Sequence, residues 1–485
     1  MDTNSDPTNA LHDPRRIRIA QIDEKIAQLQ AERHALIASF TFPVITLPVE
    51  ITSEIFVRCL SDNPLDYSTT EVAVVLGHVC RRWRDIALSI PCLWAGWSLA
   101  IDRGTSLQQI CAGIKLWLSR SKDRPLSIRL YHADGVRRDV DEEDEDWWER
   151  AWDFGHAVVP LLLEHQRRWK NIDFSVPVSI LRSIPPLTQG HSDLTHLVLG
   201  SAERDWGGGG DEEVITYFAL APKLRSLHIV LEEHHLSQMD PVQLPYAQLT
   251  SFTGTMFSPM ECAFILSLTP ALVEGVFYLH DGDANMAHHV ASPTTLSHLK
   301  SLKLWSTTAR VRPVEALDYL TLPSLETLAF GCCKLTAGLW TFWERSDECA
   351  IRHFFCESME WRELRNCLEL MSELDTLELL QYDQQVVTDV MRRLHHHGEL
   401  SSLLPELQSL TVHCHKKRHD GDFPFIDLLS LLEELVTCTP LQRFRLTWTS
   451  PLLPRRPNLE ESARFRMLVA KGMDIYVGNQ ETSWI

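Results

Sequence analysis

The segment Leu299-Lys300-Ser301-Leu302-Lys303-Leu304 decides the fold class, because its spacing returns along most of the 485-residue chain. With other apolar residues allowed at the leucine positions, the pattern L-x-x-L-x-L begins at residues 169, 194, 224, 249, 272, 299, 325, 351, 374, 407 and 441. Successive starts lie 23 to 34 residues apart, as from 249 to 272 and from 407 to 441. A period of this size indicates a chain built from repeated supersecondary units.

The alternation within each segment predicts a short strand. Leu302 and Leu304 would face one side of it and Lys303 the other. Helical stretches such as 262–268 and 428–435 precede most segments, and neighbouring units must stack because none can bury its apolar face alone. The sequence therefore predicts an α/β fold in which residues 98–478 form a solenoid with a curved parallel sheet, followed by a tail at 479–485.

Both ends of the array carry matching elements. Residues 97–101 and 126–130 predict additional strands, and residues 107–118 predict a helix between them. At the other end, residues 459–471 predict a last helix with Gly472 as its C-terminal cap, and residues 474–477 predict a closing strand.

The amino-terminal region does not show the L-x-x-L-x-L repeat. Residues 1–14 form a polar leader that we expect to be disordered, and residues 15–42 predict an amphipathic helix. Its apolar residues alternate in steps of three and four, with Arg33 at one position of the series: Ile19, Ile22, Ile26, Leu29 and Leu36. Because the pattern is shorter than the three to four heptads typical of a coiled coil, we expect this helix to pack on its own chain, with self-association as the less favoured alternative.

Residues 43–97 predict a compact helical module. A first helix opens at Leu47-Pro48, with proline where its missing N–H costs nothing. The segment 72–89 also predicts an amphipathic helix. Its apolar stripe consists of Val72, Val75, Leu76, Val79, Trp83 and Ile86. A module this small buries little core, so its apolar surface is expected to seek a partner.

These motifs resemble a known family. Leu47-Pro48-x-Glu50-Ile51-x-x-Glu54-Ile55, the run 79–87 and Pro91-x-Leu93-Trp94 closely resemble the F-box, in particular the F-box-like proteins of mushroom-forming fungi. The remainder is similar to divergent leucine-rich repeats. The Asn or Cys that usually completes the repeat occurs only as Cys333, so the resemblance implies an irregular, flatter solenoid.

The resemblance implies a substrate-recognition adaptor of a Skp1–cullin–RING (SCF-type) ubiquitin ligase, without catalytic activity or cofactor. The F-box would dock a Skp1-like linker, and the repeats would hold a protein substrate. The residues carried over as docking or module-core positions are Leu47, Pro48, Ile51, Ile55, Val79, Trp83, Leu93 and Trp94. We expect Leu47, Pro48 and Ile51 to dock and Trp83 to lie in the core. Two alternatives stay open: a scaffold whose F-box-like helices only cap the solenoid, and an enzyme hidden on a divergent solenoid.

Strand positions that point away from the helices are the candidate substrate face. They are Val198, His228, Thr253, Lys303, Phe355, Glu378, Thr411 and Arg445, with Arg443 nearby. Their mixed chemistry predicts protein recognition through a broad surface.

Composition argues against several other classes. The formal charge of −19 offers no broad positive surface for nucleic acid. No apolar run is long enough to cross a bilayer, and the polar first sixteen residues contain no secretory signal, so we expect an intracellular protein, cytoplasmic and/or nuclear, with no membrane partner. The twelve cysteines include no C-x-x-C pair and read as reduced thiols.

Three local clusters are more simply explained as surface loops. Histidines 395–397 and the group His413, Cys414, His415 and His419 fit no zinc-finger spacing, so no metal is predicted. Glycines 207–210 precede acidic residues that would repel phosphate. The acidic run 139–149 is read as a solvated loop, with an acidic docking patch for a basic partner as the alternative.

Overall fold

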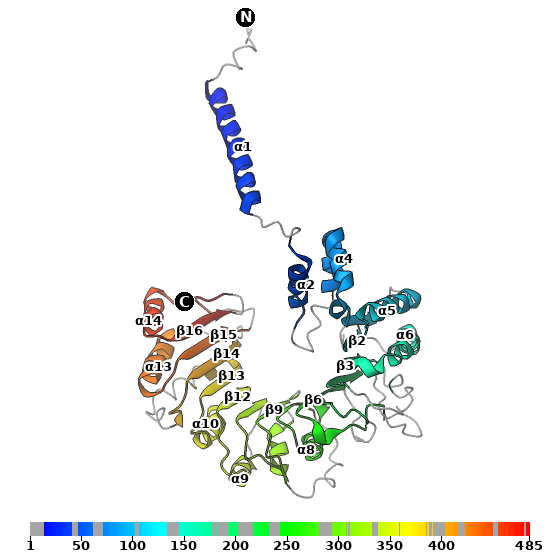
Figure 1. The fold of residues 1–485 in the computed structure, drawn as a ribbon. Coiled ribbons are helices and arrows are strands. Elements are labelled where there is room, and N and C mark those ends of the chain that lie inside the picture. Colours follow the sequence, from blue (N-terminus) through cyan, green and yellow to red (C-terminus); the bar gives the residue numbers. More distant parts are fainter. Residues whose placement is uncertain are drawn as a thin grey trace, which may run out of the picture. The chain divides into compact units, whose positions relative to one another are not determined.

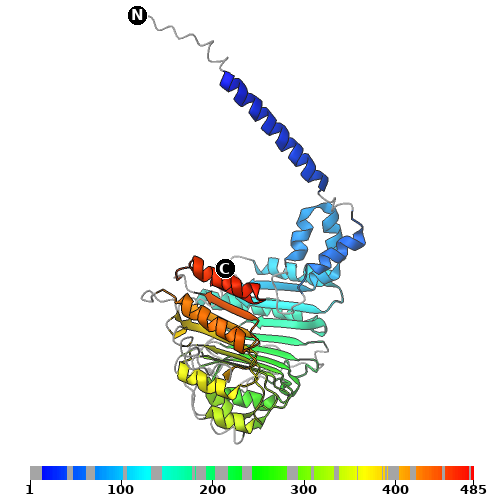
Figure 2. The same cartoon turned by 90° about the vertical axis from the view of Figure 1, so that its left-hand side faces the viewer.

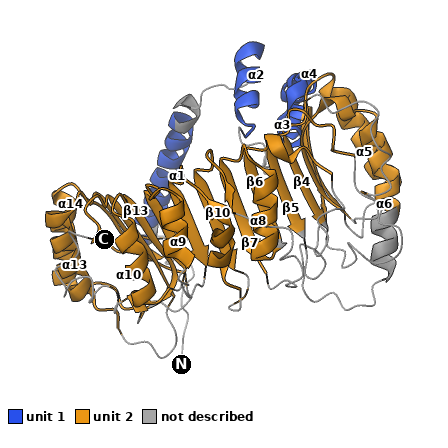
Figure 3. Ribbon diagram, turned by 90° about the horizontal axis from the view of Figure 1, so that it is seen from below, with its two compact units in different colours: residues 1–61, 71–93 blue, residues 62–70, 94–485 orange. Residues whose placement is uncertain are grey.

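The fold is that of a computed structural model, which describes residues 14–40, 47–61, 71–101, 106–132, 145–176, 181, 193–201, 217–231, 243–280, 293–306, 308, 311–331, 338–357, 359–384, 386–387, 390, 403–415, 422–449, 454–479 and 482–485. The chain divides into two compact units (Figure 3). One comprises residues 1–61 and 71–93, and the other residues 62–70 and 94–485. The division falls between Leu93 and Trp94, a few residues before the predicted module end at residue 97.

The first unit consists of helices. They are α1 (Pro14–Phe40), α2 (Val49–Arg58), α3 (Val72–Val79) and α4 (Arg81–Ser89), and a 3-10 turn η3 (Pro91–Trp94) follows. α1 confirms the helix predicted over 15–42, whereas the predicted leader lies outside the described residues except for Pro14. We call α2, α3 and α4 the helical module.

The apolar stripe predicted over 72–89 is wrong as a single helical face. Cys80 has extended backbone angles (φ −160°, ψ 169°) and separates α3 from α4. Its thiol accepts a hydrogen bond from the backbone N–H of Trp83, at 3.4 Å, and so caps the start of α4. The stripe is therefore divided between two helices. Leu76 of α3 and Ile86 of α4 are buried, whereas Val75 and Val79 of α3 are exposed.

The second unit is built on one large parallel sheet (Figure 1). Its strands follow one another in chain order. They are β1 (Gly96–Ile101), β2 (Leu126–His132), β3 (Trp169–Ser175), β4 (His196–Ser201), β5 (Ser226–Leu231), β6 (Ser251–Phe257), β7 (Glu274–Leu279), β9 (Ser301–Ser306), β11 (Thr327–Gly331), β12 (His353–Glu357), β13 (Thr376–Asp383), β14 (Ser409–His415), β15 (Arg443–Trp448) and β16 (Asp474–Asn479). Two short strands, β8 (Thr294–Thr295) and β10 (Leu320–Thr321), pair separately.

Helices cover one face of this sheet (Figures 1 and 2). They are α5 (Leu107–Ser121), α6 (Glu145–Leu163), α8 (Pro259–Leu268), α9 (Gly338–Arg345), α10 (Trp361–Leu370), α13 (Phe425–Cys438) and α14 (Leu459–Ala470), with 3-10 turns η4 (Gln166–Arg168), η5 (Tyr246–Gln248) and η7 (Pro313–Tyr319). The described residues place no helix of this unit on the other face, which we call the open face. Helix α14 and strand β16 confirm the predicted closing elements, and Gly472 has the positive φ of a C-terminal cap.

The register explains the repeat. Each of the eleven L-x-x-L-x-L segments contains a strand, and the second apolar position of one pairs with that of the next, as in Leu302 with Leu328 and Leu328 with Phe354. These side chains are buried beneath the helices. The α/β class, the large parallel sheet and the separate N-terminal helices are therefore confirmed, while the leucine-rich-repeat solenoid and its curvature stay predictions.

Two glycines replace the expected large residues in adjacent repeats. Gly254 of β6 pairs with Phe277 of β7, and Phe252 pairs with Gly275. The space left by each glycine is filled by rings, since Phe252 and Phe277 stack at 5.2 Å and Phe257 lies edge-on to both. A Cβ on Gly254 would lie 2.8 Å from Phe257 Cδ2 and 2.9 Å from Phe252 Cε1.

Restoring the repeat consensus by Gly254→Leu is therefore expected to destabilise the protein by about 1–3 kcal/mol, because an overpacked core must shift. Gly113→Ala is the matched control, since nothing lies within 4 Å of its added methyl group in α5. That control should raise stability by roughly 0.5–1 kcal/mol through helix propensity. Denaturant unfolding of both variants checks this, and a Gly254→Leu variant as stable as wild type would show that the rings do not fill the site.

Candidate binding surfaces

Short contacts hold the helical module together. The Thr52 hydroxyl donates to the Pro48 carbonyl at 3.0 Å, and the Arg82 guanidinium donates to the Leu47 carbonyl at 2.7 Å. Arg84 similarly donates to the Gly77 carbonyl at 2.9 Å. The Thr52 bond stabilises the first turn of α2, and the two arginine bonds attach the start of α2 and the end of α3 to α4.

The module core is aromatic. Phe56 is fully buried and meets the Trp83 ring edge-on at 5.0 Å between centroids. Trp83 itself is half-buried, in keeping with the core role predicted for it. Leu93 and Trp94 are buried, and Trp94 packs edge-on against Trp117 with Arg120 stacked on its ring. These two positions therefore serve packing and not surface contact.

The remaining F-box-like positions stay at the surface. Ile51 is 50% exposed, Ile55 44% and Val79 58%, Pro48 is exposed, and Leu47 is half-buried. Val75, a member of the apolar stripe predicted over 72–89, is 60% exposed. Ile51 and Ile55 lie one turn apart on α2, and Val75 and Val79 one turn apart on α3. We call these the exposed aliphatic pairs.

The predicted substrate-face residues lie in one row across the sheet. The register connects Ser98, Arg129, Asp173, Val198, His228, Thr253, Val276, Lys303, Ala329, Phe355, Glu378, Thr411, Arg445 and Tyr476. Arg443 lies two residues earlier on β15, on the same side of its strand. The row alternates with buried leucines along each strand and therefore faces the open side. Most of its members are partly exposed, but Asp173, Val198 and Ala329 are buried.

Several charges on the open face are satisfied within the sheet. Glu378 accepts from His413 at 3.1 Å, and Asp474 lies 3.2 Å from Arg443 and 3.6 Å from Arg445. Because these groups already have partners within the sheet, their value as isolated charged anchors for a partner is lower.

Burial perturbs two groups of the same row. Burial raises the pKa of Asp173 to about 6, although Arg129 lies 3.1 Å away and acts in the opposite direction. Burial also lowers the pKa of His228, which favours the neutral imidazole. Both shifts favour the neutral form of the side chain, because burial penalises the charged form.

The centre of the face is aromatic. Lys303 Nζ lies 5.4 Å from the Phe355 ring, a cation–π distance. Two residues farther along their strands, Tyr278 and Trp305 are paired neighbours, and Tyr278 is exposed. Glu357 borders this patch, and burial raises its pKa. The sequence reasoning missed Tyr278, Trp305 and Glu357, although the period-two alternation continues through them.

The chemistry-bearing clusters do not converge. His413 and Cys414 face opposite sides of β14, because successive strand side chains alternate, and burial raises the pKa of the Cys414 thiol far above its usual range. The described residues include no group of three potential metal ligands. Histidines 395–397, His419 and glycines 207–210 lie outside the described residues, and no side chain of the acidic run 139–149 is described.

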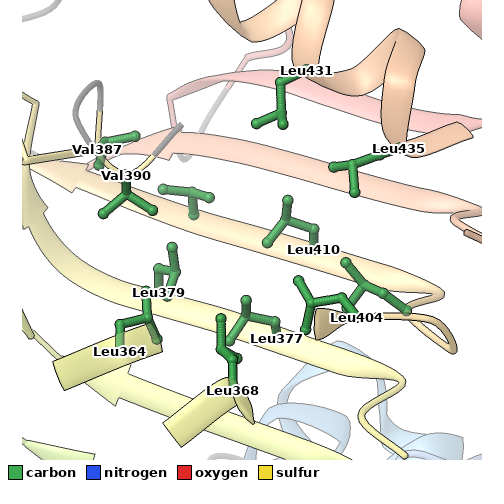
Figure 4. Close-up of a pocket in the computed structure, with 12 residues that line it drawn as sticks. Leu364, Leu368, Leu377, Leu379, Val387, Val390, Leu404, Leu410, Leu431 and Leu435 are labelled. Carbon is green, nitrogen blue, oxygen red and sulfur yellow. The ribbon is translucent and has the colours of Figure 1, made fainter. Parts of the chain in front are cut away.

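A small pocket lies inside the sheet unit between α10, β13, β14 and α13 (Figure 4). Its lining is entirely aliphatic, with residues such as Leu364, Leu377, Leu410 and Leu431 pointing into it. It therefore offers packing space and no reacting group.

Among the helices in the described residues, none is long and apolar enough to span a membrane.

Comparison with known proteins adds little. No family model matches the chain, and no curated protein matches it. One solved structure that is similar in part is a protein from Bacteroides fragilis, at 12% identity and a TM-score of 0.29, over 52% of this chain and 65% of that one. The chain thus spans just under two thirds of that protein, and a likeness this weak carries no argument about fold or function.

Proposed function

We propose that this protein is a non-catalytic, intracellular adaptor that joins a protein substrate to a Skp1–cullin–RING ubiquitin ligase. In this proposal the helical module is an F-box that docks a Skp1-like linker. The parallel strands form an irregular leucine-rich-repeat solenoid whose open face binds the substrate. Neither membrane nor nucleic acid is a partner in this proposal.

The observation that carries the proposal is the surface of the helical module. Its exposed aliphatic pairs stand on helices whose own core is already closed by Phe56, so they are not needed for the module's packing. Aliphatic anchors that become buried at a partner surface supply much of the binding energy of protein interfaces. The proposal therefore gives these four side chains the role of anchors.

The competing scaffold reading makes the module a cap. It requires Leu47 and Ile51 to be covered by the chain's own repeats, and within the helical module itself Ile51 is 50% exposed and so is available to a partner surface. The enzyme reading requires titratable groups that converge in a cleft, and the described pocket is aliphatic. On the open face, the patch of Lys303, Phe355, Tyr278 and Trp305 supports a role in protein recognition, because aromatic residues are enriched at such interfaces.

The test is binding to a purified Skp1 homologue, measured by pull-down and calorimetry. The double variant Ile51→Asp/Ile55→Asp should bind at least about 100-fold more weakly than wild type, since each anchor contributes on the order of 2 kcal/mol. Leu47→Ala/Pro48→Ala should also weaken binding. The matched control is Ile426→Asp, which changes an equally exposed isoleucine on α13 of the sheet unit and should bind like wild type. Equal recovery of every variant, or recovery of none including wild type, would contradict the docking role.

A further inference from the structure

The long helix α1 presents an apolar stripe that the other described helices of its own unit leave exposed. Ile17, Ile19, Ile22, Ile26, Leu29 and Leu36 are each between 47% and 57% exposed. Within its own unit, the expected packing of α1 is not seen, while its packing on the sheet unit stays a prediction. Six half-exposed aliphatic side chains on one helix of 27 residues indicate a surface that another helix covers.

Five of the six fall on the two core positions of a heptad. Ile19 and Ile26 take the a positions, whereas Ile22, Leu29 and Leu36 take the d positions. Ile17 lies off this stripe. Arg33 occupies the third a position, where a cation in the middle of an apolar seam constrains how two such helices can be aligned.

We propose that α1 pairs with α1 of a second copy of this chain as a short antiparallel coiled coil. A parallel pair would place the two Arg33 residues directly opposite each other in the seam. The antiparallel alignment that covers the same stripe sets Ile26 against Leu29 of the second copy and Ile19 against Leu36. Each Arg33 then faces Ile22, and the two like charges lie apart near opposite ends of the seam.

The flanking charges favour the same orientation. Lys25 and Glu32 both occupy g positions, which face each other in an antiparallel pair, so the dimer contains the Lys25–Glu32 attraction twice. In a parallel pair Lys25 would face Gln30 instead.

The helix dipole adds a second argument for the antiparallel orientation. Arg15 and Arg18 lie in the first turns of α1, where the positive end of the dipole disfavours cations. Antiparallel pairing brings them beside the negative end of the partner helix. The inference goes beyond the adaptor role and is independent of it, because no residue of α2, α3 or α4 takes part.

Sedimentation velocity of the full-length chain over a range of concentrations tests the pairing. Wild type should form a concentration-dependent dimer, and Ile26→Asp/Leu29→Asp should remain monomeric at every concentration. Glu24→Lys is the control, because residue 24 lies on the side of the helix away from the seam, and its dimer should match wild type. A wild-type protein that stays monomeric throughout, or a double variant that still dimerises, would overturn the proposal.

A charge-reversal cycle tests the orientation. Lys25→Glu alone and Glu32→Lys alone should each weaken the dimer several-fold, because each creates two like-charge contacts, and the double variant Lys25→Glu/Glu32→Lys should restore wild-type affinity. Circular dichroism should show equal helix content in all three. Single reversals that leave the dimer unchanged, or a double variant without rescue, would refute the antiparallel alignment. Skp1 binding by the monomeric variant separates a failure of this inference from a failure of the proposed adaptor function.

Discussion

Replacing Phe56 with alanine is expected to unfold the helical module while the parallel sheet stays folded. Phe56 is fully buried, and its ring meets Trp83 edge-on at 5.0 Å. Truncating a buried phenylalanine costs about 3–5 kcal/mol, because the transfer free energy of the ring is lost and a cavity remains. A module of three short helices has a small core, so a loss of this size is comparable to its whole stability.

Hydrogen exchange with peptide resolution measures this effect. The amides of 49–58 and 72–89 should lose their protection in the Phe56→Ala variant, and those of β9 and its neighbours should keep it. Ile55→Ala is the control, since its side chain is exposed and lies next to Phe56 in the sequence. Unchanged protection in α2 would mean that Phe56 does not support the module, and lost protection across the sheet would mean that the two units unfold together.

Removing Arg455 is expected to destabilise the carboxyl-terminal end of the sheet unit by roughly 3–5 kcal/mol, because it leaves a buried carboxylate without its cation. Glu461 is 2% exposed and accepts two hydrogen bonds of 2.6 Å from the Arg455 guanidinium. The same carboxylate accepts from the Asn458 backbone N–H at 2.7 Å and completes a capping box at the start of α14. Urea unfolding of the Arg455→Met variant measures this loss of unfolding free energy. The control is Arg466→Met, which changes an arginine on the exposed side of α14. Equal midpoints for the two variants would show that the ion pair contributes nothing.

The capping box of α8 provides a natural contrast. Glu261 is also buried, and its carboxylate accepts a hydrogen bond of 2.8 Å from the Ser258 backbone N–H in the same way, but Ser258 brings no positive charge. Burial therefore raises the pKa of Glu261, whereas Arg455 lowers the pKa of Glu461. The two carboxylates make stability depend on pH in opposite directions.

The direction of each pKa shift determines how the contribution of that carboxylate to stability depends on pH. Glu461 contributes stability that is present above the ordinary carboxyl pKa and is lost as the pH falls through its lowered pKa in the folded state. Glu261 contributes stability at low pH that is lost as the pH rises through its raised pKa. Glu461→Gln should therefore destabilise the protein at pH 7, and Glu261→Gln should cost little there, because glutamine can still complete the box. Unfolding free energies measured from pH 4 to 8 check this, and similar losses for both variants at pH 7 would contradict it.

The sequence alone determined the strand order. L-x-x-L-x-L is a local signal that repeats, and each unit must bury the same apolar pair against its neighbours, so the strands follow one another in parallel without information from distant residues. The same alternation correctly placed His228, Lys303, Phe355, Glu378 and Arg445 in one row, because side-chain direction in a strand depends only on sequence parity.

Tertiary structure decided what surrounds each residue. The spacing over 72–89 predicted one apolar stripe, yet the chain breaks at Cys80 into two helices, since a capping thiol is not visible in a hydrophobic period. Within α3, Leu76 is buried while Val75 and Val79 are exposed. Gly254 and Gly275 stand at apolar positions of the repeat, and only the structure shows that the rings of Phe252, Phe257 and Phe277 fill the space beside them. Local patterns specify backbone geometry, whereas burial and pKa depend on neighbours that are distant in the sequence, and only the folded chain brings those neighbours together.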